Sequence, residues 1–294
     1  MKSLKGYLLI LAATTFWGIA ATIAKFLFTH DVDTLTLVQL RMTFSCIVLL
    51  LYFFFFKRHL LRVQFRDLYK FAMLGILGAA GSNFTYYYTI AATNVATAIL
   101  LQYLAPLLVL LYAVVAREEK ITAIKTTASV VSLGGCYLAV AGKDFSIISI
   151  NNLGLIAGLA SAFCWGFTNV WLKRLLKQYN VWTSLIYAFL FASLFWCVIN
   201  PPWNVLSAGY SMETWGIFFG FAMISILIPH SLYFSGMRYL TASRAIITAT
   251  FEPIVAIISA YFIVYEILSA VQIVGAVLVL LAIGILQLKQ EENK

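Results

Sequence analysis

Two stretches of the chain resemble each other: LAATTFWGIAATIAK at residues 11–25 and LASAFCWGFTNVWLK at residues 159–173. Sliding the chain along itself by 148 positions aligns the dipeptides Leu11-Ala12 and Trp17-Gly18, and the single residue Lys25, with Leu159-Ala160, Trp165-Gly166 and Lys173. Both stretches are long, apolar and nearly free of charge, as a membrane-spanning helix requires. They therefore predict a duplicated unit that begins with a membrane helix.

More matches follow at a shift of 147. Tyr86, Ala98, Ile99, Pro106, Ala113 and Glu119 fall on Tyr233, Ala245, Ile246, Pro253, Ala260 and Glu266. Apolar helices match one another by chance, but Trp, Pro, Lys and Glu are rare in them. The sequence therefore predicts two copies of one five-helix unit, residues 1–146 and 147–294, within a single membrane domain.

Composition supports an integral membrane protein. Of the 294 residues, 63% are hydrophobic and 11% charged, whereas a soluble domain has about 25% charged residues. The mean hydropathy is +0.94. The apolar runs predict an all-α protein with ten transmembrane helices, near residues 6–28, 35–56, 70–92, 95–116, 122–141, 153–175, 182–199, 215–236, 242–264 and 268–287.

The basic residues predict the orientation, because Lys and Arg accumulate in cytoplasmic loops. With the N-terminus inside, cytoplasmic segments hold seventeen of the twenty Lys and Arg residues. Lys25 and Lys143 lie outside, and Arg41 lies within the second helix. Both termini are thus expected inside. Because each unit has an odd number of crossings, the two copies are expected to be inverted, as in many secondary transporters.

Other classes of protein are disfavoured. The charge of +9 is spread over loops, whereas nucleic-acid binding needs clustered bases. The four cysteines lie in apolar stretches without CxxC spacing, so no disulfide or zinc site is expected. The sequence contains no GxxxxGK[ST] motif, so ATP binding is not expected. An intramembrane enzyme stays a remote alternative, since one midplane acid forms no catalytic pair. We expect no cofactor and no metal.

Several short motifs carry a family resemblance. They are Phe16-Trp17-Gly18, Leu40-Arg41, Ala105-Pro106 with Glu119, and Phe251-Glu252-Pro253 with Glu266. Together, along the whole chain, they resemble the ten-helix EamA group of the drug/metabolite transporter superfamily. The resemblance implies a pseudo-symmetric bundle with a central cavity, and usually export of amino acids or other small metabolites.

Glu252 is the leading candidate for function because it lies ten residues into its predicted span. A midplane acid costs about 3 kcal/mol and usually faces a cavity or a partner. It could bind an amine, take up a coupling proton or brace the helix. Ala105 occupies the equivalent place in the first copy.

Pro106 and Pro253 lie at the midpoints of helices four and nine, where proline frees the carbonyls of Gln102 and Ala249. They could be hinges or static kinks. Trp17 and Trp165 could form cavity walls that bind a cation with about 0.5–2 kcal/mol, or they could pack helices. Of three consecutive tyrosines, Tyr86 to Tyr88, at most two can face a cavity.

The remaining candidates are polar residues within spans. Asn83, Gln102 and Asn169 could bind substrate or bridge helices. Arg41 could snorkel to the membrane surface, pair with Asp31 or Asp33, or bind a substrate carboxylate. His230 is the one histidine within a span, and a proton relay is one role open to it.

These residues predict a secondary transporter of a small metabolite, such as an amino acid or amine. We expect an exporter or facilitator, working by alternating access in a bacterial plasma membrane. A lipid or glycolipid flippase of the same superfamily is the main alternative. Expected partners are the small-molecule substrate, membrane lipid and coupling protons, with no nucleic acid, and the chain is expected to be a monomer or homodimer.

Overall fold

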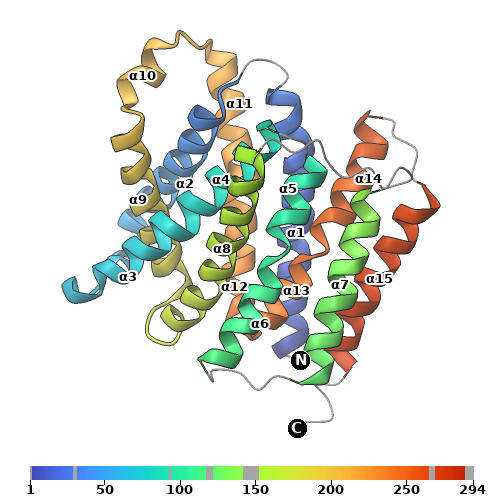
Figure 1. Cartoon of the computed structure of the whole chain (residues 1–294). Coiled ribbons are helices and arrows are strands. Elements are labelled where there is room, and N and C mark those ends of the chain that lie inside the picture. Colours follow the sequence, from blue (N-terminus) through green and yellow to red (C-terminus); the bar gives the residue numbers. More distant parts are fainter. Residues whose placement is uncertain are drawn as a thin grey trace.

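The computed structural model describes residues 2–28, 32–92, 95–116, 122–141, 152–264 and 269–288. Within these ranges the chain is helical and has no strand, which confirms the all-α class. The helices form one bundle, with α1 in its middle and α9 and α15 toward opposite sides (Figure 1). Lys143, Glu119, Glu266, Asp31 and the expected boundary at residues 146 and 147 lie outside the described residues.

The described helices of residues 2–141 are α1 (Lys2–Phe28), α2 (Thr34–Phe56), η1 (Arg58–Leu61), η2 (Phe65–Asp67), α3 (Leu68–Met73), η3 (Leu74–Gly81), α4 (Ser82–Ala92), α5 (Val95–Gln102), α6 (Ala105–Val115) and α7 (Ala123–Ala141). Those of residues 152–288 are α8 (Asn152–Leu175), α9 (Val181–Ile199), α10 (Pro202–Ser207), α11 (Met212–Ala222), η4 (Met223–Leu227), α12 (Ile228–Met237), α13 (Ala242–Ala249), α14 (Glu252–Val264) and α15 (Ala270–Leu288).

Five described helical stretches are long and apolar enough to cross a membrane. They are Ser3–Ala24, Thr34–Phe56, Asn152–Leu175, Val181–Ile199 and Met212–Met237. The other predicted spans are also helical over most of the residues that the structure describes, with turns at residues 103–104 and 250–251. The count of ten crossings, the inverted order of the two copies and the inside termini stay predictions.

Two predicted spans are interrupted, each close to the proline at which a hinge or a kink was expected. A turn at Tyr103 and Leu104 separates α5 from α6, and a turn at Thr250 and Phe251 separates α13 from α14. In both turns the backbone tightens to bonds between residues three apart, such as Leu104 N–H to Leu101 O and Phe251 N–H to Thr248 O. Proline at the second position of the following helix, where a backbone N–H is not needed, fits this geometry.

Two other spans contain a π-helical segment. The segment η3 joins α3 to α4, and η4 joins α11 to α12, so each long helix changes its pitch midway. Such π-segments are rare and often lie at functional sites. Both adjoin the residues that form the cavity described below.

The bundle is held by contacts between distant parts of the sequence. The helix α1 packs against α12 and α14, and α4 packs against α8. Gly18 allows the close approach of α1 to α14, because a Cβ there would lie 2.7 Å from Cβ of Val255 and 2.9 Å from the Glu252 carbonyl oxygen. At one side of the bundle α7 and α15 lie side by side (Figure 1).

The connection between α2 and α3 carries an ion pair. Lys70 Nζ lies 2.9 Å from Asp67 Oδ1, and the Tyr179 hydroxyl donates to Asp67 Oδ2 at 2.5 Å. The hydrogen bonds from Lys70 and Tyr179 lower the pKa of Asp67, and the bond to Asp67 raises the pKa of Lys70. This cluster ties the start of α3 to the loop that precedes α9.

Candidate substrate-binding site

A cavity with a volume of about 50 Å³ lies in the middle of the bundle. It is lined by Trp17, Arg41, Ser82, Asn83, Tyr86, Tyr87, Gln102, Trp165, His230 and Glu252. Ligand sites of small molecules have volumes of about 300–1,000 Å³. The space between these side chains is smaller in this conformation, so the lining side chains must move apart to admit a whole metabolite.

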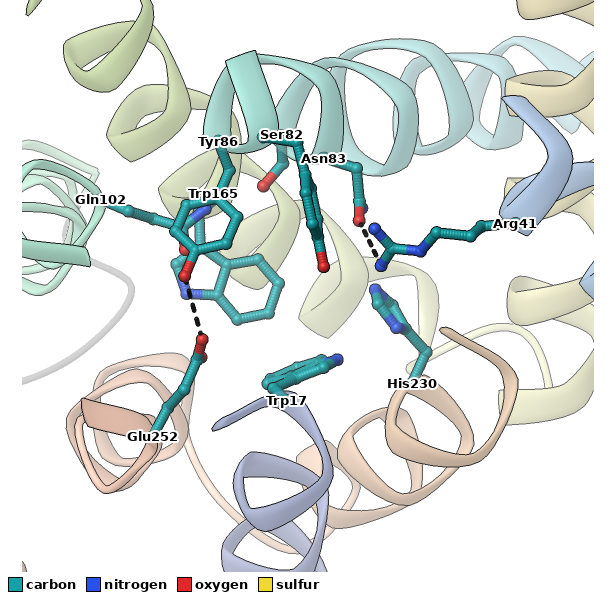
Figure 2. Close-up of a pocket in the computed structure, with 10 residues that line it drawn as sticks. Trp17, Arg41, Ser82, Asn83, Tyr86, Gln102, Trp165, His230 and Glu252 are labelled. Carbon is teal, nitrogen blue, oxygen red and sulfur yellow. Dashed lines mark hydrogen bonds between the residues drawn. The ribbon is translucent and has the colours of Figure 1, made fainter. Parts of the chain in front are cut away.

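Residues from widely separated helices meet at this cavity (Figure 2). Trp17 comes from α1 and Arg41 from α2, while α4 contributes four residues. Gln102 is the last residue of α5 and Glu252 the first of α14. The cavity thus lies where two helices end or begin, so that polar backbone groups as well as side chains are close to it.

Of the nine residues expected to bind substrate or couple ions, eight line this cavity. They are Trp17, Arg41, Asn83, Tyr86, Gln102, Trp165, His230 and Glu252. Asn169 does not line it, because its Oδ1 accepts a 2.5 Å bond from the Tyr233 hydroxyl and its Nδ2 donates to the Trp165 carbonyl. The predicted hinges Pro106 and Pro253 are also outside the lining, one residue beyond the starts of α6 and α14.

Glu252 is 6% exposed and held by two tyrosines. The Tyr103 hydroxyl lies 3.0 Å from Oε2, and the Tyr86 hydroxyl lies 3.4 Å from Oε1 (Figure 2 draws the second bond). The hydroxyl of Tyr103 has one proton, and the shorter of its two contacts, 2.6 Å, is that to the Ala249 carbonyl, to which it donates. This carbonyl receives no bond from Pro253, because proline has no N–H. The position of Glu252 at the first residue of α14 places its carboxyl group at the positive end of the helix dipole.

Arg41 is 2% exposed, so it does not snorkel to a surface. Asp33, one of its two expected partners, instead accepts the backbone N–H of Thr36 and caps α2. The guanidinium lies 4.3 Å from the ring centre of Tyr87 and 5.1 Å from that of Phe221. Arg41 is therefore a cation inside the bundle, at the edge of the cavity.

Aromatic rings form the wall opposite α4. Trp17 meets Trp165 edge to face at 5.5 Å between ring centres and contacts His230 at 5.1 Å. Tyr233 lies behind them, 5.2 Å from Trp17 and 5.1 Å from Trp165. Its hydrogen bond to Asn169 fixes this arrangement, so Asn169 positions the wall without reaching the cavity.

His230 and Asn83 bond to carbonyl oxygens of the helical turns before them. His230 Nδ1 lies 3.0 Å from the Ile226 carbonyl oxygen of η4. Asn83 Nδ2 donates to the Ala79 carbonyl of η3 at 2.9 Å, and its Oδ1 accepts from Arg41 at 3.5 Å. Both side chains thus partner carbonyl groups within the two π-segments.

Three residues of the site were not singled out from the sequence. Ser82 lines the cavity, while Tyr103 and Tyr233 hold side chains that do. Tyr86 and Tyr87 line it without Tyr88, in keeping with the expected limit of two. The match of Tyr86 with Tyr233 between the copies was the one signal that pointed to Tyr233.

A bundle of apolar helices around a buried polar and aromatic cavity defines a multi-pass membrane protein with an internal ligand site. The EamA-like transporter family model matches residues 4–141 and again residues 152–288. The chain therefore belongs to the EamA-like transporter family and is a transporter of the drug/metabolite type.

Similar proteins agree with this assignment. The uncharacterized inner membrane transporter YicL of Salmonella typhimurium is 25% identical, over 85% of this chain and 84% of its own. The riboflavin transporter ImpX of Fusobacterium nucleatum is 26% identical, over 95% and 96%. A solved crystal structure superposes with a TM-score of 0.75 at 15% identity, covering 100% of this chain and 98% of that one, which shows a shared fold.

The family, the inner-membrane relatives and the long apolar helices together support a multi-pass protein of the plasma membrane.

Proposed function

We propose that this chain is a secondary transporter of a small organic metabolite, such as an amino acid or amine, and that it works as an exporter or facilitator. The observation that carries the proposal is the cavity, because it collects a carboxyl group, a guanidinium and two indole rings from helices of both matched segments. An apolar substrate with polar groups at its ends would find partners for each part.

We further propose that the two matched segments are inverted repeats of five helices, so that alternating access exchanges their conformations. Equivalent breaks support this. At the shift of 147, α5 (Val95–Gln102) falls on α13 (Ala242–Ala249), and the first residue of α6 falls on the first of α14. The π-segment η4 falls within the shifted η3. Cysteines introduced as Lys143→Cys and Lys177→Cys should then be labelled from opposite sides of the membrane.

Within this mechanism, Glu252 acts directly on the substrate or on a coupling proton. Pro106 and Pro253 follow the two breaks and are the proposed hinges. Two discontinuous helices with their ends near a central site resemble the arrangement found in other secondary transporters. Glu252 is the acid that lines the cavity beside these helix ends, so its carboxyl group can contact a bound substrate.

Replacement of the acid tests this role. Glu252→Gln keeps the size of the side chain and one acceptor oxygen but removes its charge and its titration, so it should insert into the membrane normally but abolish transport. Glu213→Gln, at an exposed position of α11, is the matched control and should transport normally. Metabolite efflux from cells overproducing each variant, with and without a proton uncoupler, gives the readout. Normal transport by Glu252→Gln would exclude a direct role.

The name of the Fusobacterium relative adds a second candidate substrate. Riboflavin has a flat ring system, and the walls formed by Trp17, Trp165 and Tyr86 suit a flat ring. Uptake of riboflavin by the same cells distinguishes the two candidates, because riboflavin transport should depend on the aromatic walls more than on Glu252.

A further inference from the structure

Arg41 is a buried cation with unused hydrogen-bond donors. Its Nε and Nη1 are buried without a partner among the residues that the structure describes. These two atoms carry three of the five N–H groups of a guanidinium. The third nitrogen, Nη2, makes long bonds, 3.5 Å to Asn83 Oδ1 and 3.4 Å to the Ser225 carbonyl. The side chain is therefore held in place but far from satisfied.

The groups around Arg41 do not neutralise it. In the described part of the chain the ion pair found is that of Lys70 with Asp67, so no carboxylate contacts the guanidinium. The titratable groups that face it are Tyr86 and Tyr87 on α4 and His230 on α12. Glu252 lies on the far side of the cavity (Figure 2). A charge in a membrane bundle normally faces a partner or a cavity, and here the cavity is what it faces.

A purely structural role accounts for the hydrogen bonds of one nitrogen and for the contacts of the guanidinium with two aromatic rings. Nη2 joins Ser225 of η4 to Asn83, the second residue after η3. An amide side chain could make such a bridge without the large desolvation cost of a buried cation. The choice of a guanidinium with free donors at a cavity therefore points to an anionic ligand, since guanidinium groups match carboxylates in charge and geometry.

We propose that Arg41, positioned by Asn83 and Ser225, is an anion subsite that binds a carboxylate group of the transported substrate. This inference rests on the transport function proposed above and narrows its substrate to a carboxylate-bearing metabolite. The rings of Trp17, Trp165 and Tyr86 receive its apolar body, and Glu252 receives a donor at its other end. A simple amine without a carboxylate leaves Arg41 unneutralised and binds poorly.

Binding of matched probes tests the subsite. Hydrocinnamate and its amide share a phenyl ring and differ in charge, and phenylalanine and phenethylamine differ in the presence of a carboxylate. Because Trp17 and Trp165 line the cavity, the tryptophan fluorescence of the protein in nanodiscs can report binding. The wild-type protein should bind hydrocinnamate about tenfold or more tightly than the amide, as expected for charge-assisted hydrogen bonds.

Three variants make the test specific. Arg41→Gln should abolish the preference for the acid over the amide, and Arg41→Lys should restore part of it. Asn83→Asp keeps Arg41 and places a carboxylate of the same size beside it, so it should weaken carboxylate binding by competition. Arg58→Gln, at the exposed first residue of η1, is the matched control and should keep the wild-type preference.

Three results would overturn the subsite: equal binding of acid and amide by the wild type, an unchanged preference in Arg41→Gln, or no binding of any carboxylate probe at millimolar concentration. If Arg41→Gln does not fold, Asn83→Asp decides the test, because unchanged carboxylate binding by that variant would also overturn the subsite. Transport that persists without a carboxylate preference overturns the subsite alone. A wild-type chain that moves no metabolite in the efflux screen overturns the proposed function instead.

Discussion

The Tyr103 hydroxyl connects the two helix breaks, and its removal gives a direct test of their energetics. It lies in the turn between α5 and α6 and reaches the Ala249 carbonyl and Glu252 Oε2, on either side of the turn between α13 and α14. Tyr103→Phe keeps the ring, which is 2% exposed, and removes the hydroxyl alone. The Ala249 carbonyl then loses the donor that stands in for the missing N–H of Pro253.

The expected loss of unfolding free energy follows from these two contacts. A hydrogen bond within a membrane protein contributes about 0.6 kcal/mol on average and about 1.7 kcal/mol at most. A buried carbonyl left without a donor costs about 1–3 kcal/mol. The bond to Ala249 is short, at 2.6 Å, and the site is closed. Tyr103→Phe should therefore destabilise the protein by about 1–3 kcal/mol.

Unfolding of the purified protein by SDS in mixed micelles measures this loss. Tyr86→Phe is the matched control, because its hydroxyl makes one long bond of 3.4 Å to Glu252. Its removal should cost no more than about 0.6 kcal/mol. If Tyr103→Phe unfolds like the wild type, or if Tyr86→Phe loses as much stability, the hydroxyl does not hold the two breaks together.

Two further predictions concern packing and pH. Gly18→Ala should destabilise the protein by about 1–3 kcal/mol, because its Cβ would lie 2.7 Å from Val255, whereas Gly220→Ala, with nothing within 4 Å, should be tolerated; SDS unfolding compares them. Asp67→Asn should destabilise the protein at neutral pH. Since its partners lower the pKa of Asp67, the stability it gives is present above its unfolded pKa of about 3.9 and lost as the pH falls through its folded value. Unfolding at neutral and acidic pH should thus show the difference from wild type shrinking in acid, and a constant difference contradicts the assignment.

Much of the fold could be predicted because apolar runs and their polar boundaries set helix positions. Each described helix of eight or more residues lies largely within an expected span. The breaks were less accessible. Pro106 and Pro253 indicated a perturbed helix, but whether a helix bends or ends there depends on partners for the freed carbonyls, such as Tyr103 for Ala249. Those partners come from tertiary structure.

The site was predictable to the extent that its residues are unusual in a membrane helix. Glu252, Arg41 and His230 are titratable groups in apolar surroundings, and the sequence singled them out for that reason. Tyr103 has no such signal, because tyrosine is common in this chain and the role of its hydroxyl depends on the groups that it contacts in the folded protein. Asn169 shows the converse, since a rare polar residue turned out to orient Tyr233 behind the cavity wall.

The packing of α1 bears on how the protein is made. This helix precedes the other described helices in the chain, so it leaves the ribosome before the partners it packs on, α12 and α14, are made. Until then, the face of α1 that packs on α12 and α14 lacks these partners. The hydroxyl groups of Thr14 and Thr15 both donate to the Leu11 carbonyl of the same helix. They therefore need no hydrogen-bond partner from α12 or α14 while those helices are not yet made. A nascent chain cut after α7 would thus hold a stable helix but no completed assembly, and the two parts would need to be produced together in one cell.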